Sequence, residues 1–394
     1  MAAAEGEEFT AKIHPRIAEI DAEAWDLCAG RENPFVSHAF LSALEESGSA
    51  VARTGWAGAH LTIEDGDGRL IGAMPLYMKG HSRGEYVFDY GWSDAYERAG
   101  GRYYPKLLCA VPFVPATGPR LLTHPDLPRE SIRQALAQTA VAACAQLDAS
   151  SVHINFLPEA DWKALGDLDY LQRTDQQFHW YNDNYPDFDG FLAALSSRKR
   201  KTIRRERREA LANDIEIVEL RGADLGEEHW DAFYSFYMDT GGRKWGTPYL
   251  TRDFFSLVGE RMAERIVLFL CRRSGRWIAG ALNFLGSDCI YGRHWGCLED
   301  HRFLHFETCY YRAIDYAIAH GLDRVEAGAQ GPHKLMRGYL PTHTYSAHWI
   351  RDSAFSDAVA RYLNEERREV DAHIAHLSDY APFRQDDERL EEQD

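Results

Sequence analysis

The residues that could carry out chemistry gather in the second half of this 394-residue chain. His305 and Glu307 stand where a helix is expected to begin, and an imidazole or a carboxylate can accept a proton during catalysis. Tyr311 follows on the same expected helix and can donate a hydrogen bond, and His333 lies in a later polar turn. We therefore expect a proton-transfer site among Glu307, His333, His305 and Tyr311.

A run of basic residues is the second feature of this half. The segment 198–208 reads RKRKTIRRERR, with eight basic residues and one acidic residue, in a chain whose net charge is −17. Three interpretations stay open: a solvated helix face, a clamp for phosphate groups, or contact with anionic lipids. The clamp would consist of Arg198, Lys199, Arg200, Lys201 and Arg204. The acidic total excludes non-specific DNA binding, and the lack of interleaved aromatics disfavours single-stranded RNA.

Two stretches of the chain are similar to each other and indicate a duplication. Residues 33–44 read NPFVSHAFLSAL, and residues 247–258 read TPYLTRDFFSLV. Each copy is followed by a predicted strand hairpin, at 68–73 (GRLIGA) and at 275–281 (GRWIAGA). Similarity over such long spans is typical of a repeated domain rather than of a short solenoid repeat.

The expected elements follow the same order in both halves. In the first half we expect helices at 15–30, 34–47 and 129–148, strands at 58–64, 69–79, 85–90 and 151–156, and a proline-rich extended segment at 103–122. In the second half we expect helices at 189–212, 227–240, 251–264, 304–320 and 355–378, and strands at 215–220, 266–272, 277–285, 289–295 and 324–328. This is the order of the GNAT acyltransferase fold, which has two helices, three antiparallel strands, a further helix and a further strand.

Several longer motifs carry a resemblance to a known family. They are GEYVFD at 84–89, YPKL at 104–107, YGRHWG at 291–296, LHFETCYY at 304–311 and EAGAQGPHK at 326–334. With them the chain resembles the FemAB-like tandem-GNAT proteins of bacteria, often described as peptidoglycan biosynthesis or recognition acyltransferases. The resemblance implies an α+β fold with two GNAT-like domains. Domain 1 (1–175) would form part of a substrate groove, and domain 2 (176–394), with the basic helix 189–212 and a C-terminal helix, would be catalytic.

The resemblance also implies amide-forming acyl transfer, with acyl-CoA or aminoacyl-tRNA as the donor. Two departures from the family pattern bear on this. The loop that holds the CoA pyrophosphate in many GNAT enzymes is glycine-rich, whereas 298–303 reads LEDHRF here. A family run expected as Gly-Glu-His-Lys reads Gly-Pro-His-Lys at 331–334, so its glutamate cannot be the base in this chain.

For such a transfer, the base that takes the amine proton would be Glu307 or His333, with His305 as a third candidate and Tyr311 as a donor in the cleft. Glu307 can equally serve as a partner of the helix dipole. Side chains alternate along a strand, so polar residues at the strand ends that line the expected cleft share one face. For the same reason, Glu85 and Asp89 are expected on one face of their own strand. The predicted substrate-binding residues are Glu85, Asp89, Lys106, Arg293, Trp295, Glu326, Gln330, Lys334 and Arg337.

The function expected from these residues and the resemblance is an N-acyltransferase. It would move an acyl group from acyl-CoA or an acyl carrier to the primary amine of a cell-envelope lipid precursor, as in ceramide-type N-acylation. Alternatives are aminoacyl-tRNA-dependent transfer to a peptidoglycan precursor, and non-catalytic muropeptide recognition. We expect no permanently bound cofactor and no metal, because the histidine spacing matches no zinc pattern. We expect a cytoplasmic location, with peripheral contact at the inner membrane face as an alternative.

Overall fold

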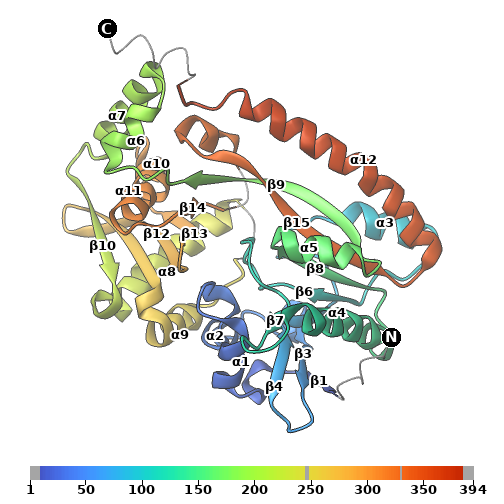
Figure 1. Ribbon diagram of the computed structural model, residues 1–394. Helices are drawn as coiled ribbons and strands as arrows, with labels where there is room; N and C mark the ends of the chain where they lie inside the picture. Colours follow the sequence, from blue (N-terminus) through green and yellow to red (C-terminus); the bar gives the residue numbers. More distant parts are fainter. Residues whose placement is uncertain (1–8, 245–247, 329–330, 385–394) are drawn as a thin grey trace. The chain divides into compact units, whose positions relative to one another are not determined.

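The computed structural model describes residues 9–244, 248–328 and 331–384 (Figure 1). The chain divides into two compact units. Met1–Asp175 and Thr344–Val370 form the first unit, and Gln176–His343 and Asp371–Asp394 form the second. The divisions fall within strand β9 (Leu171–Tyr181), near the start of β15 (Leu340–Ile350) and within helix α12 (Ser353–Ser378).

The first unit contains two groups of paired strands. One sheet has the order β1 (Thr10–His14), β3 (His60–Glu64), β4 (Leu70–Met74), β7 (Leu122–Thr123). In the other group, the order of neighbouring strands is the C-terminal part of β15, then β8 (Ser151–Leu157), β6 (Lys106–Cys109), β5 (Leu76–Lys79) and β2 (Trp56–Gly58). The helices of this unit are α1 (Ala22–Ala29), α2 (His38–Glu46), α3 (Tyr90–Arg98), α4 (Arg129–Gln146) and α5 (Glu159–Gly166). Leu136 of α4 is fully buried in the core with Leu107 and Val152.

The second unit has strands in the order β10 (Ile215–Arg221), β11 (Ile266–Arg273), β12 (Arg276–Leu285), β13 (Cys289–Cys297), β14 (Arg324–Glu326), followed by the end of β9. β13 and β14 run parallel, and the other neighbours are antiparallel. The helices are α6 (Phe188–Ala194), α7 (Ser197–Ala210), α8 (Glu227–Lys244), α9 (Arg252–Met262), α10 (Leu304–Phe306) and α11 (Arg312–Ala319). None of the helices in the described ranges could cross a bilayer.

The two similar stretches fold alike, although each helix begins later than expected. Asn33 caps a short 3-10 turn at 34–36, and α2 starts only after Ser37, whose hydroxyl accepts from the Phe40 amide at 3.3 Å. In the second copy Thr251 takes the matching place before α9. Thr247 lies outside the described residues. The Ser37 hydroxyl, which accepts from an amide of the first turn, sets the start of α2.

Two expected elements are wrong in this structure. The helix expected at 189–212 is two helices, because residues 195–196 are extended and the Ser196 amide donates to the Pro382 carbonyl at 2.9 Å. The strand expected at 85–90 does not form. Glu85 and Asp89 lie in the loop before α3, where Tyr86 has a φ of 60° that no strand accommodates.

A buried pair of histidines joins β8 to β15 in the first unit and leads to a testable prediction. Nδ1 of His153 lies 2.7 Å from Nδ1 of His348, and each outer nitrogen bonds a serine, Ser151 or Ser346. Burial lowers the pKa of both, that of His153 to about 3. The unfolded chain takes up protons below about pH 6.5, and the folded pair does not.

Stability should therefore be full above about pH 6.5 and should fall as the pH drops toward 3. Each histidine contributes a slope of up to about 1.4 kcal/mol per pH unit. We expect the double variant His153→Asn/His348→Asn to flatten this dependence, measured by urea unfolding at pH 7.5 and 5.5. Exposed His373→Asn is the control. An unchanged slope in the double variant would contradict this reasoning.

Candidate active site

A cleft opens where β13 and β14 separate. Their parallel register ends at the pair Tyr291 and Glu326, whereas β13 continues to Cys297 without further β14 pairing in the described residues. On the other side, the register between β12 and β13 shifts at Leu282/Asn283. A cavity of about 90 Å³ lies at this point. Its lining includes Asn283, Arg293, His294, Trp295, His305, Cys309, Tyr310 and Gly328.

A π-helix at Glu307–Tyr311 interrupts the helix expected at 304–320 and determines which tyrosine reaches the cleft. Tyr310 lines the cavity, and its hydroxyl lies 2.9 Å from Nε2 of His333. Tyr311, the expected cleft donor, is instead fully buried and donates to Glu206. The extra residue of a π-turn changes which side chains share a helix face.

The proton states of the Tyr310–His333 pair follow from their surroundings. Burial raises the pKa of Tyr310 above its usual range, so the phenol keeps its proton. Burial, together with Arg337 and Lys334, lowers the pKa of His333, so this imidazole is neutral at pH 7. The ring of His305 packs against Tyr310 with centroids 5.3 Å apart. The cavity is thus bordered by a phenol in contact with a neutral imidazole that can accept a proton.

Glu307 is held in an ion pair rather than facing the cavity. Its side chain is 1% exposed and accepts from Arg207 at 3.0 and 3.1 Å and from Arg312 at 3.1 Å. Burial raises the pKa of this carboxyl, while both arginines oppose the rise. Arg207 also bonds Asp315. Glu307 therefore ties α7 to the π-helix, and its expected role as a base does not fit this placement.

A second ion pair fixes the turn that carries His333. Arg337 donates to both oxygens of Glu206 at 3.0 and 2.9 Å and to the His333 carbonyl at 2.8 Å. Its guanidinium lies 3.5 Å from the centroid of the Phe306 ring. Arg337 was expected to bind the substrate. In this structure its positive charge is balanced by Glu206, the one acidic residue of the basic run 198–208. Glu206 thereby positions the 332–337 turn.

Lys334 points inward from the same turn. It is 1% exposed, and its Nζ donates to the carbonyl of Gly328, a residue of the cavity wall, at 2.7 Å. Burial lowers the pKa of Lys334 to about 7, so a neutral amine is accessible near physiological pH. Glu326 accepts from Arg324 at 3.2 Å at the end of β14. Gln330 lies outside the described residues.

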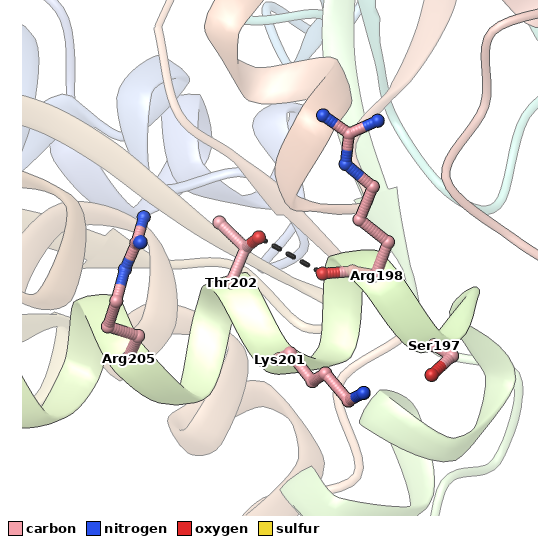
Figure 2. A pocket seen from close by; sticks show the side chains of 5 residues that line it. All are labelled: Ser197, Arg198, Lys201, Thr202 and Arg205. Atoms are coloured by element: carbon pink, nitrogen blue, oxygen red, sulfur yellow. Dashed lines mark hydrogen bonds between the residues drawn. The ribbon is translucent and has the colours of Figure 1, made fainter.

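The basic helix α7 turns one face inward and one outward (Figure 2). Ile203 and Glu206 are buried, whereas an open groove is lined by Ser197, Arg198, Lys201, Thr202 and Arg205. Figure 2 shows the side chains of Arg198, Lys201 and Arg205 extending from the helix.

The other predicted clamp residues on α7 differ in their placement. Arg204 pairs with Asp189 at 3.0 Å, and Lys199 contacts the sulfur of Met336. Arg200 lies on the same helix and is partly exposed. The groove therefore includes two of the predicted clamp residues, Arg198 and Lys201, and adds Arg205.

In the first unit, three predicted substrate ligands form a buried cluster. Nζ of Lys106 lies 2.7 Å from Glu85 and also bonds Asp89, and all three side chains are at most 2% exposed. Although burial opposes the charge, the two carboxylates raise the pKa of Lys106. Burial raises the pKa of Glu85 to about 7 and lowers that of Lys79, 3.9 Å away, to about 7. The structure brings these three predicted residues together, although not on the expected strand, and it pairs Lys106 with both carboxylates.

The loop between β13 and α10 has no cradle for a pyrophosphate. Glu299 occupies it and accepts from Arg273 at 3.0 Å and shares a hydrogen bond with His301 at 2.9 Å. Within the described ranges, no three histidine, cysteine or acidic side chains are placed to hold a metal.

Comparison with known proteins identifies the family. A model of the FemAB-like family, described as peptidoglycan biosynthesis/recognition, matches residues 16–385. The chain belongs to the FemAB-like family. The crystal structure of FemX is similar to this FemAB-like protein, with a TM-score of 0.54 and 13% identity over 90% of this chain and all of FemX. L-PGS from Bacillus licheniformis has a TM-score of 0.50 and 10% identity, over 85% of this chain and 98% of L-PGS.

A third similar structure is the C-terminal domain of a proposed lysylphosphatidylglycerol synthetase from Agrobacterium fabrum. Its TM-score is 0.53 and its identity 8%, over 88% of this FemAB-like chain and 96% of that domain. A comparison with curated proteins found no match. Together the matches confirm the predicted α+β fold of two tandem GNAT-like domains.

Three residues of this FemAB-like site were missed by sequence reasoning. Tyr311 was chosen as the cleft donor in place of Tyr310 because the π-turn was not foreseen, and Glu206 was counted only as the one acidic residue of the basic run. Asn283 stands alone in the apolar strand segment 277–285, which reads WIAGALNFL. An isolated amide in a buried strand is the one signal that could have been noticed, because buried polar groups need partners.

Proposed function

We propose that the chain is an N-acyltransferase that joins the acyl group of a thioester to the primary amine of a cell-envelope lipid precursor. Family membership supports the coarser statement, a transferase of acyl or aminoacyl groups acting on envelope precursors. The observation that carries the proposal is the β13–β14 cavity, where Tyr310 meets neutral His333. We also propose that the first unit forms part of the groove that binds the substrate.

The reaction needs a neutral amine and a stabilised oxyanion. Tyr310 accepts a proton from the amine as it passes its own proton to His333, and the amine nitrogen then attacks the thioester carbonyl carbon. The C–S bond breaks, and the leaving thiolate takes one of the two protons left on nitrogen, so that the amide keeps the other. Proton transfer of this kind contributes about 10²- to 10⁴-fold to the rate. Lys334 holds the Gly328 carbonyl and keeps the cleft wall in place.

Aminoacyl-tRNA is the alternative donor, because the loop 298–303 has no glycine and carries Glu299, which accepts from Arg273 at 3.0 Å. The test is to incubate the purified protein with palmitoyl-CoA, palmitoyl carrier protein or charged tRNA, and to detect amide products by mass spectrometry. Transfer from a thioester that resists RNase supports the proposal. RNase-sensitive transfer would replace it with the tRNA reaction, and no transfer from any donor would favour muropeptide recognition.

The outward face of α7 should bind the anionic part of the donor. We expect Arg198→Glu/Lys201→Glu to raise the donor KM at least about tenfold at low salt, and the difference from wild type to shrink at high ionic strength. The exposed α12 pair Arg361→Glu/Arg368→Glu changes the net charge equally and is the matched control. Equal effects of both double variants on KM would leave α7 without a specific role.

A further inference from the structure

Asn283 of β12 is a buried amide with one unused acceptor. It is 1% exposed, and its Nδ2 donates to the carbonyls of Val267 at 3.1 Å and Ala281 at 3.3 Å. Since both contacts are acceptors, they fix the NH₂ end of the amide, and the other end is the oxygen. Oδ1 accepts no hydrogen bond from any described residue. A buried acceptor left unpaired is destabilising, so this oxygen is expected to have a partner in the working enzyme.

The unused oxygen lies next to Gly292 at the wall of the cavity. Asn283 pairs across the sheet with Gly292, at the point where the β12–β13 register shifts, and both residues line the cavity. A Cβ placed on Gly292 would lie 3.4 Å from Asn283 Oδ1, 3.5 Å from the Ala327 Cα and 3.6 Å from the Glu326 carbonyl oxygen. Because Gly292 has no side chain, no Cβ stands beside these two carbonyl-type oxygens at the cavity wall.

We propose that Asn283 Oδ1 and the Glu326 carbonyl form the subsite that binds the primary amine of the acyl acceptor. This inference rests on the proposed function and names the place of its nucleophile. An alkylammonium has three N–H bonds. Two are held by the two oxygens, and the third is removed through Tyr310, which frees the lone pair for attack.

The subsite also explains how the enzyme selects an amine. A hydroxyl has only one donor and cannot satisfy both oxygens, so an alcohol of the same size leaves one acceptor unpaired. Sites built on buried hydrogen-bond partners discriminate strongly for this reason. The neighbouring ring of Trp295 and the apolar wall of Ala281 and Ala327 suit the carbon chain that carries the amine.

Gly292→Ala tests the subsite, because its methyl would fill the space at ordinary contact distances and should leave the fold intact. Gly91→Ala, where a Cβ meets nothing within 4 Å, is the matched control. Binding of n-butylammonium chloride, with n-butanol as the neutral probe, is followed by saturation-transfer NMR. We expect wild type and Gly91→Ala to bind the ammonium in preference to the alcohol, and Gly292→Ala to bind it at least tenfold more weakly.

Equal ammonium binding by Gly292→Ala, or no binding by the wild type, would overturn the inference, even if acyl transfer is observed. Where transfer is observed, Gly292→Ala should raise the KM for the amine at least tenfold, and Gly91→Ala should leave that KM unchanged. If the wild type binds the ammonium through Gly292 but transfers no acyl group, the amine subsite stands and the proposed function fails. The two ideas can therefore be rejected separately.

Discussion

Replacing His333 with glutamine should lower the rate of amide formation at least about 100-fold. Glutamine can still bond the Tyr310 hydroxyl, but it cannot take up the proton that the amine releases. The His333 side chain is only partly covered by its neighbours, so the free energy of unfolding should change little. The measurement is a single-turnover rate with the donor that wild type accepts, alongside urea unfolding.

The pH profile gives the same test a second readout. Because burial, Arg337 and Lys334 lower the pKa of His333, wild-type kcat/KM should rise with pH and reach its plateau at a lower pH than an ordinary imidazole would give. This rising limb should be absent from His333→Gln. His301→Gln, at a histidine that bonds Glu299 in the nearby loop, should keep both rate and profile. A His333→Gln enzyme that forms the amide at the wild-type rate would contradict the proposed proton transfer from the amine through Tyr310 to His333.

Replacing Glu307 with glutamine should act on stability instead of chemistry. The buried carboxylate balances Arg207 and Arg312, and removing one partner of a buried ion pair costs about 3–5 kcal/mol. We expect the lower end, about 3 kcal/mol, because both arginines are partly exposed and Arg207 keeps Asp315. Urea unfolding measures the loss, and the transfer rate per folded molecule should stay within about threefold of wild type.

Asp315→Asn serves as the matched comparison for Glu307→Gln. Asp315 bonds the same arginine but is 31% exposed, so its loss should cost less than about 1 kcal/mol. A Glu307→Gln protein that is fully stable yet inactive would return Glu307 to the role of base.

The sequence predicted the repeated order of elements because local signals mark it. The Asp65–Gly68 turn forms as expected, with the Gly68 amide bonded to the Asp65 carbonyl at 3.0 Å. Strands β9 and β15 were missed for a physical reason. Their buried positions include Arg173, His179 and His348, which hydrogen bonds satisfy, so the usual apolar alternation is absent.

The candidate site was predicted by segment more than by residue. The family motifs led to the cleft between 291–296 and 326–328, and the structure places the cavity there. The choice between Tyr310 and Tyr311 depended on a π-turn that arises from packing, and the inward orientation of Glu307 depended on arginines distant in sequence. Neither could be derived from spacing alone.

The rate of amide formation by Tyr310→Phe tests the central claim most directly. The substitution removes one oxygen atom and keeps the ring that packs against His305 and Phe306. The proposed relay predicts at least about a 100-fold fall in kcat/KM with little change in donor binding. A Tyr310→Phe enzyme that forms the amide at the wild-type rate would contradict a reaction centred on this cleft.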